Sequence, residues 1–288
     1  MIFCLVNIKV CIKNVLLKKR IIKFNFFLSY IILNFKHMKN IRIILVMGFF
    51  FILLKMSAQS DTVYIYGPGG PYPAINEVAK IYGQNNNEII EVTKGPLKKW
   101  KEQAKIKADI IYSGAEFMMT NFIRIFNKEI ITSSITPLYL RKSGLLVRTG
   151  NPKKIKSLYD LAKPGVKILV VHGAGLTGVW EDMIGKSQNI ELLKKIRKNI
   201  VLFADNSGVA KKEWIKNNGI DVWITWNIWQ ISNPQLADFV PLKKQYTIFR
   251  DFGIALTQKG KKNKAAREFF NYLKSKKIKP VFEKWGWQ

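Results

Sequence analysis

The chain has very little cysteine and histidine. Both cysteines, Cys4 and Cys11, and one of its two histidines, His37, fall within the first 58 residues, so the rest of the chain contains only His172. These absences exclude a disulfide, a thiol nucleophile and a Cys/His zinc site in that part. No Gly-x-Ser-x-Gly nucleophile motif lies beside His172, which we interpret as a loop residue. The sequence therefore predicts no catalytic residue, no metal site and no cofactor, and hence not an enzyme.

Acidic residues are absent from the first 58 positions, which hold ten Lys or Arg and long runs of Ile, Leu, Phe and Val. Residues 38–42 are basic, residues 43–54 are apolar, and Ser57-Ala58 is a small-residue stop. The apolar core is shorter than the roughly 20 residues of a membrane span. We interpret residues 38–58 as a signal peptide, which predicts a periplasmic protein that meets the membrane only during export.

Two further points about the first 58 residues stay open. An uncleaved anchor is the alternative to the signal peptide, because Met56 stands where signal peptidase prefers a small residue. Residues 1–37 are interpreted as a mis-assigned upstream extension, with Met38 as the start.

The part of the chain after residue 58 stays strongly basic. All 19 acidic residues and 38 of the 48 basic ones lie there, which gives a formal net charge of +19. The lysines are dispersed and no basic run is interleaved with aromatic residues, so no nucleic-acid partner is predicted. Solvated lysine faces are the simpler interpretation, and attraction to an anionic envelope surface is the alternative.

Short β-branched runs alternate with helical patterns after residue 61. The runs expected as strands are residues 62–66, 89–92, 109–112, 144–148, 166–171, 200–204 and 220–225. Apolar spacing predicts a helix from Ala74 and another over residues 265–273. This alternation implies an α/β fold with mainly parallel sheets.

Turns rich in Gly, Ser or Thr follow five of these strands. The first, Tyr66-Gly67-Pro68-Gly69-Gly70-Pro71, lacks both the Gly-Lys-Ser/Thr of a P-loop and the third glycine of a dinucleotide fingerprint. The other four turns lie at residues 93–96, 113–116, 173–178 and 205–208. Ligands of open α/β sheets lie at the carboxyl ends of strands, where helix starts offer unpaired N–H groups. The turns together favour an anion site, and a plain turn remains the alternative for each one.

Several longer motifs resemble the accessory colonisation factor C family, a branch of the periplasmic molybdate/sulfate-type substrate-binding proteins. They lie at residues 66–71, 113–120, 137–141, 173–182, 226–230 and 285–287. The resemblance implies a type II periplasmic binding fold, in which two α/β lobes are joined by two crossing segments and enclose a ligand cleft. The crossings are expected near residues 143–147 and 246–255. Lobe 1 would comprise residues 59–143 plus 250–288, and lobe 2 residues 144–249.

In molybdate-type relatives, hydroxyls and main-chain N–H groups hold the anion. Carried onto this chain, the implied ligand-binding residues are Gly67, Gly69, Gly70, Thr93, Lys94, Ser113, Gly175, Thr177, Asn206, Ser207, Trp226 and Asn227. The first loop lacks the hydroxyl of the relatives, and the second has Thr93-Lys94-Gly95 in place of paired serines. The ligand is therefore left open between an inorganic oxyanion and a small organic acid. Lys94 or Arg250 would pair a carboxylate, whereas Glu116 or Asp251 would receive an ammonium group.

The resemblance implies a monomeric periplasmic solute-binding protein that delivers a small anion, such as sulfate, molybdate or a small carboxylate, to an ABC permease or a chemoreceptor. The alternative is an exported colonisation or adhesion factor that binds anionic host or envelope polymers through its basic surface. Of three tryptophans spaced three apart, Trp226 is the candidate for the cleft, while Trp223 and Trp229 are expected in the core.

Overall fold

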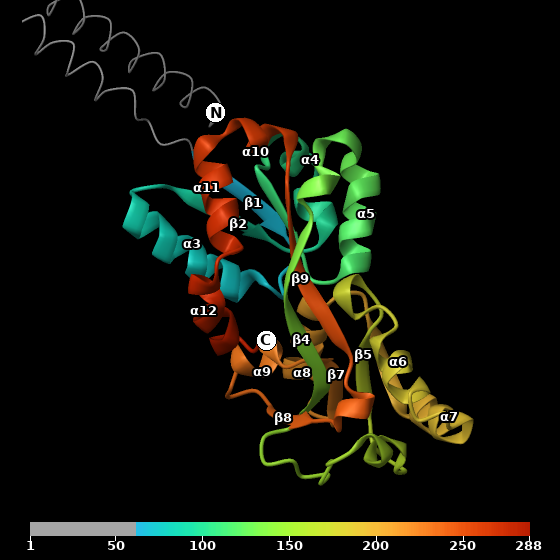
Figure 1. Ribbon diagram of the computed structural model, residues 1–288. Coiled ribbons are helices and arrows are strands. Elements are labelled where there is room, and N and C mark those ends of the chain that lie inside the picture. The colour runs from blue at the N-terminus through green and yellow to red at the C-terminus, as the bar shows by residue number, and fades with distance from the viewer. Residues whose placement is uncertain (1–61) are drawn as a thin grey trace, which may run out of the picture. The chain divides into compact units, whose positions relative to one another are not determined.

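The computed structural model of the chain describes residues 62–288 (Figure 1). The predicted signal peptide at residues 38–58 and the extension at residues 1–37 lie outside the described residues. Within residues 62–288, no helix combines the length and the apolar character needed to cross a membrane.

Nine strands of the described chain form one continuous sheet. Its order is β2-β1-β3-β9-β4-β7-β5-β6, and β8 pairs with β4 beside this path. The strands are β1 (Val63–Gly67), β2 (Ile90–Lys94), β3 (Ile110–Ser113), β4 (Thr136–Val147), β5 (Ile168–Val171), β6 (Ile200–Ala204), β7 (Val222–Trp226), β8 (Asp238–Pro241) and β9 (Phe249–Leu256).

Helices follow most of these strands and cover the sheet. They are α3 (Tyr72–Asn86), α4 (Leu97–Lys107), α5 (Glu116–Phe126), α6 (Val179–Gly185), α7 (Ile190–Asn199), α8 (Ser207–Lys216), α9 (Ile228–Ile231), α10 (Gln258–Lys262), α11 (Lys264–Leu273) and α12 (Lys279–Lys284). Short 3-10 turns connect them, among them η4 (Ala174–Leu176) after β5. Buried Ala74, Ile75, Val78, Ala79 and Tyr82 form the inward face of α3, as their helical spacing predicts.

The α/β class predicted from the sequence is confirmed, and each of the seven runs expected as strands overlaps an observed strand. The expectation of mainly parallel pairing is only half right. Four pairs, β1 with β2 and β3 and β5 with β6 and β7, are parallel. The four pairs that involve β4 or β9 are antiparallel. The difference arises because β4 and β9 are long strands that run in opposite directions through the middle of the sheet.

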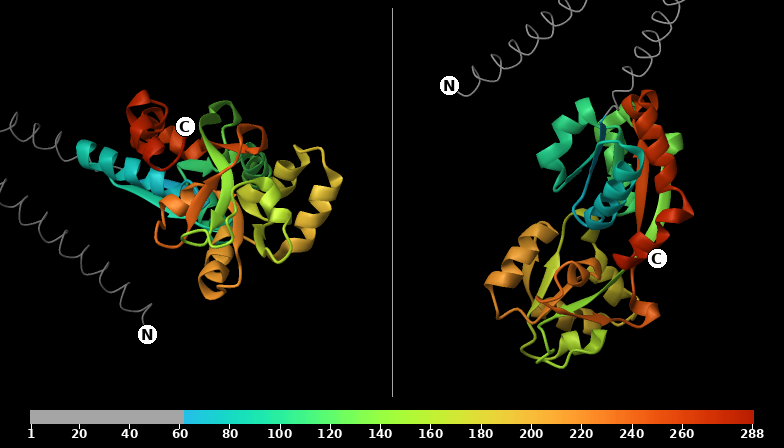
Figure 2. Two further views of the ribbon diagram at one scale, coloured as in Figure 1. Left: turned by 90° about the horizontal axis from the view of Figure 1, so that it is seen from below. Right: turned by 90° about the vertical axis from the view of Figure 1, so that its left-hand side faces the viewer.

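These two strands connect the two halves of the described chain. β4 pairs with β9 up to Lys142 and with β7 and β8 from Ser143 onward. The chain passes back from the second half to the first beside Ser143. There the Ser143 amide donates to the Ile248 carbonyl and the Ile248 amide donates to Ser143 Oγ, both at 2.9 Å. Figures 1 and 2 show β4 and β9 passing between the two groups of helices.

The hydrophobic core is divided at this crossing. One cluster lies entirely within residues 145–248 and surrounds β5, β6 and β7. Two others draw on residues 63–130 and 252–287 and surround β1, β2 and β3. We call the part around β1 to β3 the first lobe and the part around β5 to β7 the second lobe. The carboxyl ends of the parallel strands in each lobe lie toward the crossing, and this arrangement positions the site.

Candidate functional site

Turns from both lobes meet around one buried side chain, the guanidinium of Arg141. This residue lies in β4 just before the crossing and is only 3% exposed. A Cβ at Gly70 would overlap its Nη1, and Cβ atoms at Gly114 and Gly175 would come within 2.7 and 2.9 Å of its Nη2. Gly70 and Gly114 belong to the first lobe and Gly175 to the second. The missing side chains of three glycines thus make room for one cation between the lobes.

Little within the protein compensates the charge of Arg141. Its Nη2 donates to the Gly114 carbonyl at 2.5 Å, but its Nε is buried with no acceptor. None of the ion pairs among residues 62–288 includes Arg141. The negative charge of Asp251 favours the charged form of Arg141 without forming an ion pair with it. Burial lowers the pKa of Arg141 to about 9, which still leaves the group charged at neutral pH. A buried cation with so few partners favours the binding of an anion beside it.

Two indole rings hold the guanidinium in place. The Arg141 Cζ lies 4.5 Å from the ring centroid of Trp226 and 5.0 Å from that of Trp287. Both tryptophans are 2% exposed. Desolvated cation–π contacts of this kind are worth about 2 kcal/mol and fix the guanidinium plane. Trp226 therefore contacts the central cation of the site.

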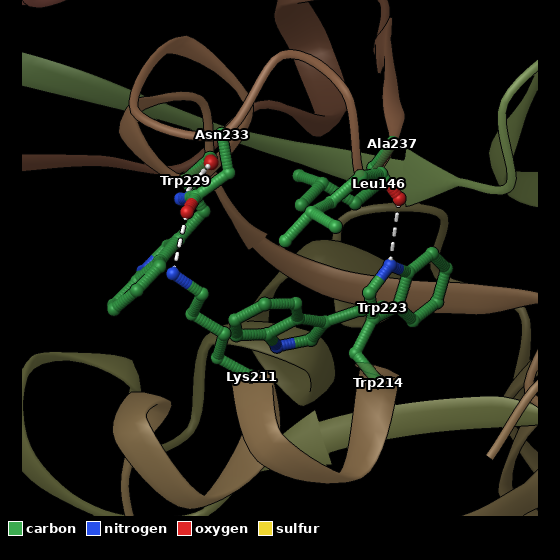
Figure 3. A pocket seen from close by; sticks show the side chains of 8 residues that line it. Leu146, Lys211, Trp214, Trp223, Trp229, Asn233 and Ala237 are labelled. Atoms are coloured by element: carbon green, nitrogen blue, oxygen red, sulfur yellow. Dashed lines mark hydrogen bonds between the residues drawn. The ribbon is translucent and has the colours of Figure 1, made fainter. Parts of the chain in front are cut away.

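The two neighbouring tryptophans lie elsewhere. Trp223 and Trp229 line a small cavity of about 10 Å³ in the second lobe, about the room for one water molecule (Figure 3). Trp214 donates its indole N–H to the Leu236 carbonyl at 2.9 Å beside them. Trp223 thus lies in the core of this lobe and Trp229 packs against it, in agreement with the interpretation made from the sequence.

The three glycines of the first loop have different surroundings. A Cβ at Gly67 would overlap the ring and carbonyl of Tyr112, so this glycine makes room for packing within the protein. A Cβ at Gly69 would meet no atom within 4 Å, whereas Gly70 faces Arg141. The helix after the loop begins at Tyr72, two residues earlier than its apolar spacing predicts, because Pro73 is favourable in the first turn.

The loop after β2 brings a second positive charge near that helix start. The ammonium of Lys94 lies 3.8 Å from the ring centroid of Tyr72. The carbonyl of Thr93 accepts a hydrogen bond from the Tyr112 hydroxyl at 3.1 Å. Lys94 can therefore add to the positive potential at the start of α3, while the main chain of Thr93 is tied to the first-lobe core.

A carboxylate of the protein, that of Asp251 in β9, lies beside the end of β3. Ser113 is fully buried and its Oγ has no partner. A Cβ at Gly253 would lie 3.1 Å from both Ser113 Oγ and Asp251 Oδ2, which places these groups around one point. Burial raises the pKa of Asp251, although the Glu116 amide at the start of α5 and the charge of Arg141 favour its ionised form. Burial also raises the pKa of Glu116, and the Asp251 charge adds to this effect.

The second-lobe turns reach the site mainly through Gly175. Thr177 is exposed, and its hydroxyl donates to the Ala174 carbonyl at 3.0 Å, so it retains only acceptor capacity in this rotamer. Asn206 caps α8, because its Oδ1 accepts from the amides of Gly208 and Val209 at 3.0 and 3.1 Å. Ser207 is the first residue of that helix. The side-chain oxygens of Thr177 and Asn206 are thus engaged within their own loops.

Asn227 joins the second lobe to the end of the chain. It is 4% exposed, and its Nδ2 donates to the Gly286 carbonyl at 2.8 Å. Its Oδ1 is buried without a partner, and its backbone amide donates to the Lys142 carbonyl at 3.3 Å. Asn227 therefore lies at the crossing, next to the Trp226 that packs on Arg141.

Arg250 has a partner within the protein. Its Nη2 donates to Asp182 Oδ2 at 2.9 Å, which links β9 to α6 of the second lobe. The sequence suggested a ligand carboxylate as the partner of Arg250. The structure gives it Asp182 instead.

Arg141, the side chain at the centre of this arrangement, is absent from the candidate residues drawn from the sequence. The sequence gives only a weak signal for it, because Arg141 is one of two adjacent cations that precede the apolar run Leu145 to Val147. Lys142, which follows it, is only half-buried. Among residues 62–288 no group of three His, Cys, Asp or Glu side chains is placed to hold a metal ion.

Comparisons with known proteins place the chain in a family. The model of the bacterial extracellular solute-binding proteins matches residues 63–288. PEB3 from Campylobacter jejuni is 38% identical, with a TM-score of 0.73 over 78% of this chain and 99% of that one. A structure of PEB3 with bound L-phospholactate is 39% identical, with a TM-score of 0.74 and the same coverage. A search of curated protein sequences finds no match.

More distant structures show the same fold. The periplasmic molybdate-binding protein of Azotobacter vinelandii is 12% identical, with a TM-score of 0.59 over 78% of this chain and 98% of that one. The sulfate-binding protein of Mycobacterium tuberculosis is 16% identical, with a TM-score of 0.64 over 78% and 86%. The type II periplasmic binding fold is confirmed, and so is the resemblance to the molybdate/sulfate-type proteins and their accessory colonisation factor C-like branch. The chain belongs to the family of bacterial extracellular solute-binding proteins.

Proposed function

We propose that this protein is a periplasmic binding protein that captures a small anion between its lobes, with the guanidinium of Arg141 as the main charge partner. The observation that carries the proposal is the burial of this cation with one hydrogen bond and no ion pair among residues 62–288. Of the residues predicted from the sequence, Gly70, Gly175, Trp226 and Asn227 lie at or beside Arg141. Of the remaining predicted residues, Lys94 would add positive charge and Ser113 a hydroxyl, and those at the helix starts, such as Ser207, would contribute main-chain N–H groups.

A small organic acid that carries a phosphate or carboxylate group is the ligand class we favour. A monatomic or tetrahedral anion can be held by neutral donors alone, as the resemblance to molybdate-type proteins implies. A planar guanidinium instead suits two oxygens of one carboxylate or phosphate group. The relative crystallised with L-phospholactate is also far more similar to this chain than the molybdate- and sulfate-binding proteins are.

Binding without chemistry and delivery to a transport partner complete the proposal. The family is one of solute-binding proteins, and the site offers no nucleophile with an activating base. An ABC permease or a chemoreceptor in the membrane would receive the loaded protein, and residues 38–58 would direct export. The buried position of Arg141 favours a small ligand over an anionic polymer, which would contact exposed lysines.

Calorimetric titration of the purified protein tests the proposal. The panel comprises L-phospholactate, phosphate, sulfate, molybdate, aspartate and a simple dicarboxylate, with heparin as the polymer probe. We expect saturable one-to-one binding of at least one small anion, most tightly of the organic phosphate. If only heparin binds, with a steep dependence on salt, the transport function is refuted and the polymer-binding alternative gains.

A further inference from the structure

The last four residues of the chain, 285–288, lie at the boundary between the lobes. Leu140 and Gln288 exchange two backbone hydrogen bonds of 2.8 Å, and Arg141 forms an isolated bridge with Trp287. The end of the chain therefore pairs with β4 through one isolated antiparallel bridge. Figure 1 and the right-hand view of Figure 2 both place the C-terminus at the level of the crossing.

This C-terminal segment contacts both lobes. Trp285 packs against the cores of the two lobes, and its indole N–H donates to Glu77 of α3 at 2.7 Å. The Gly286 carbonyl accepts from Asn227 of the second lobe. Gly286 has φ of +78°, and a Cβ there would overlap Asn227 Nδ2 and approach Ile231 Cδ1 to 2.5 Å. Both the backbone conformation and the close packing require glycine at this position.

Trp287 carries a hydrogen-bond donor that finds no acceptor in the described part of the chain. Its ring packs edge-on against Phe252 and Phe282, with centroid separations of 5.8 and 6.3 Å. Its indole Nε1 is buried and has no acceptor. The same is true of Nε of Arg141, the side chain that its ring contacts. A buried donor without an acceptor is costly, so two of them in touching side chains call for a shared acceptor.

We propose that Trp287 is a ligand-binding residue whose indole N–H donates to the anion held by Arg141. This inference rests on the proposed function and adds a specific contact to it. The indole supplies a donor and no acceptor, so it favours oxyanion groups over ammonium groups without adding charge. The pairing of residues 285–288 with β4 and with Asn227 holds that donor in place.

The substitution Trp287→Phe tests the contact, because it keeps an aromatic ring against Arg141 and removes only the indole N–H and part of the ring. We expect at least about 10-fold weaker binding of L-phospholactate by calorimetry, since hydrogen bonds to charged acceptors are the strong ones. The matched control is Trp223→Phe, which removes another buried and unpartnered indole N–H from the second-lobe core. The control should bind L-phospholactate with unchanged affinity.

The outcomes separate this inference from the function on which it rests. If Trp287→Phe binds as tightly as the natural protein while Arg141→Met does not bind, the role of Trp287 is refuted and the proposed function stands. If the natural protein binds no small anion, both fail. Should Trp287→Phe not fold, the ¹⁵N-bound indole proton of Trp287 in the natural protein is followed by NMR. A downfield shift on saturation with L-phospholactate supports the contact, and an unmoved signal refutes it.

Discussion

Replacing Arg141 by methionine should have opposite effects on binding and on stability. Loss of a buried charged partner typically costs about 2 to 5 kcal/mol of binding free energy, which corresponds to an affinity lower by about 30-fold to several thousand-fold. The free protein should become more stable. The lowering of the pKa of Arg141 to about 9 corresponds to a cost of about 5 kcal/mol for keeping the charge buried. Apolar replacement of buried charges recovers about 1 to 4 kcal/mol of such a cost.

The assay combines calorimetric titration with L-phospholactate and urea unfolding without ligand. Arg148→Met is the matched control, because Arg148 also packs on a tryptophan, with its Cζ 3.7 Å from the Trp214 ring centroid. The Arg148 side chain donates to three carbonyls, those of Ile220, Trp214 and Asn217, at 2.7 to 3.0 Å. The control should therefore lose about 1 to 3 kcal/mol of stability and bind normally. Unchanged affinity of Arg141→Met, or destabilisation equal to that of the control, would refute the reasoning.

Three further predictions concern the surroundings of the guanidinium. Gly70→Ala should weaken anion binding at least about 10-fold, because its methyl group would overlap the guanidinium, whereas Gly69→Ala, with nothing within 4 Å, should bind normally in the same titration. Sulfate keeps its charge in the pH range where carboxyl groups titrate, so its affinity should rise on acidification as Asp251, whose pKa burial raises, becomes protonated. Asp251→Asn should bind sulfate more tightly and lose this pH dependence. The raised pKa of this carboxyl also means that its contribution to stability is lost as the pH rises through that pKa. Asp182→Asn removes a partly exposed ion pair between the lobes and should weaken binding by no more than about 5-fold; a larger loss would place this residue in the site itself.

Local patterns were sufficient to predict most of the sheet. Runs of β-branched residues coincide with β1 to β3 and β5 to β7, and the carboxyl-end turns lie where the alternation of strand and helix places them. β8 escaped prediction because Asp238–Pro241 is half-buried at the edge of the sheet and ends in proline. Its pairing with β4 depends on a contact between distant parts of the chain.

The centre of the site was harder to predict, because it too depends on contacts between distant parts of the chain. Gly70 and Gly175 were identified from their turns, but the cation that they surround lies in a strand and looks like an ordinary surface arginine in the sequence. Its burial arises only when the first-lobe turns, the second-lobe turn and Trp287 close around it. The ligand residues carried over from the family resemblance also include Gly67, whose missing side chain makes room for Tyr112.

A crystal structure of the protein with its tightest-binding small anion tests the central claim most directly. We predict that a phosphate or carboxylate group lies between the lobes and accepts hydrogen bonds from the Arg141 guanidinium, including the Nε that has no partner among residues 62–288. An ordered anion bound away from Arg141, with that guanidinium still bonded only to Gly114, would contradict the account.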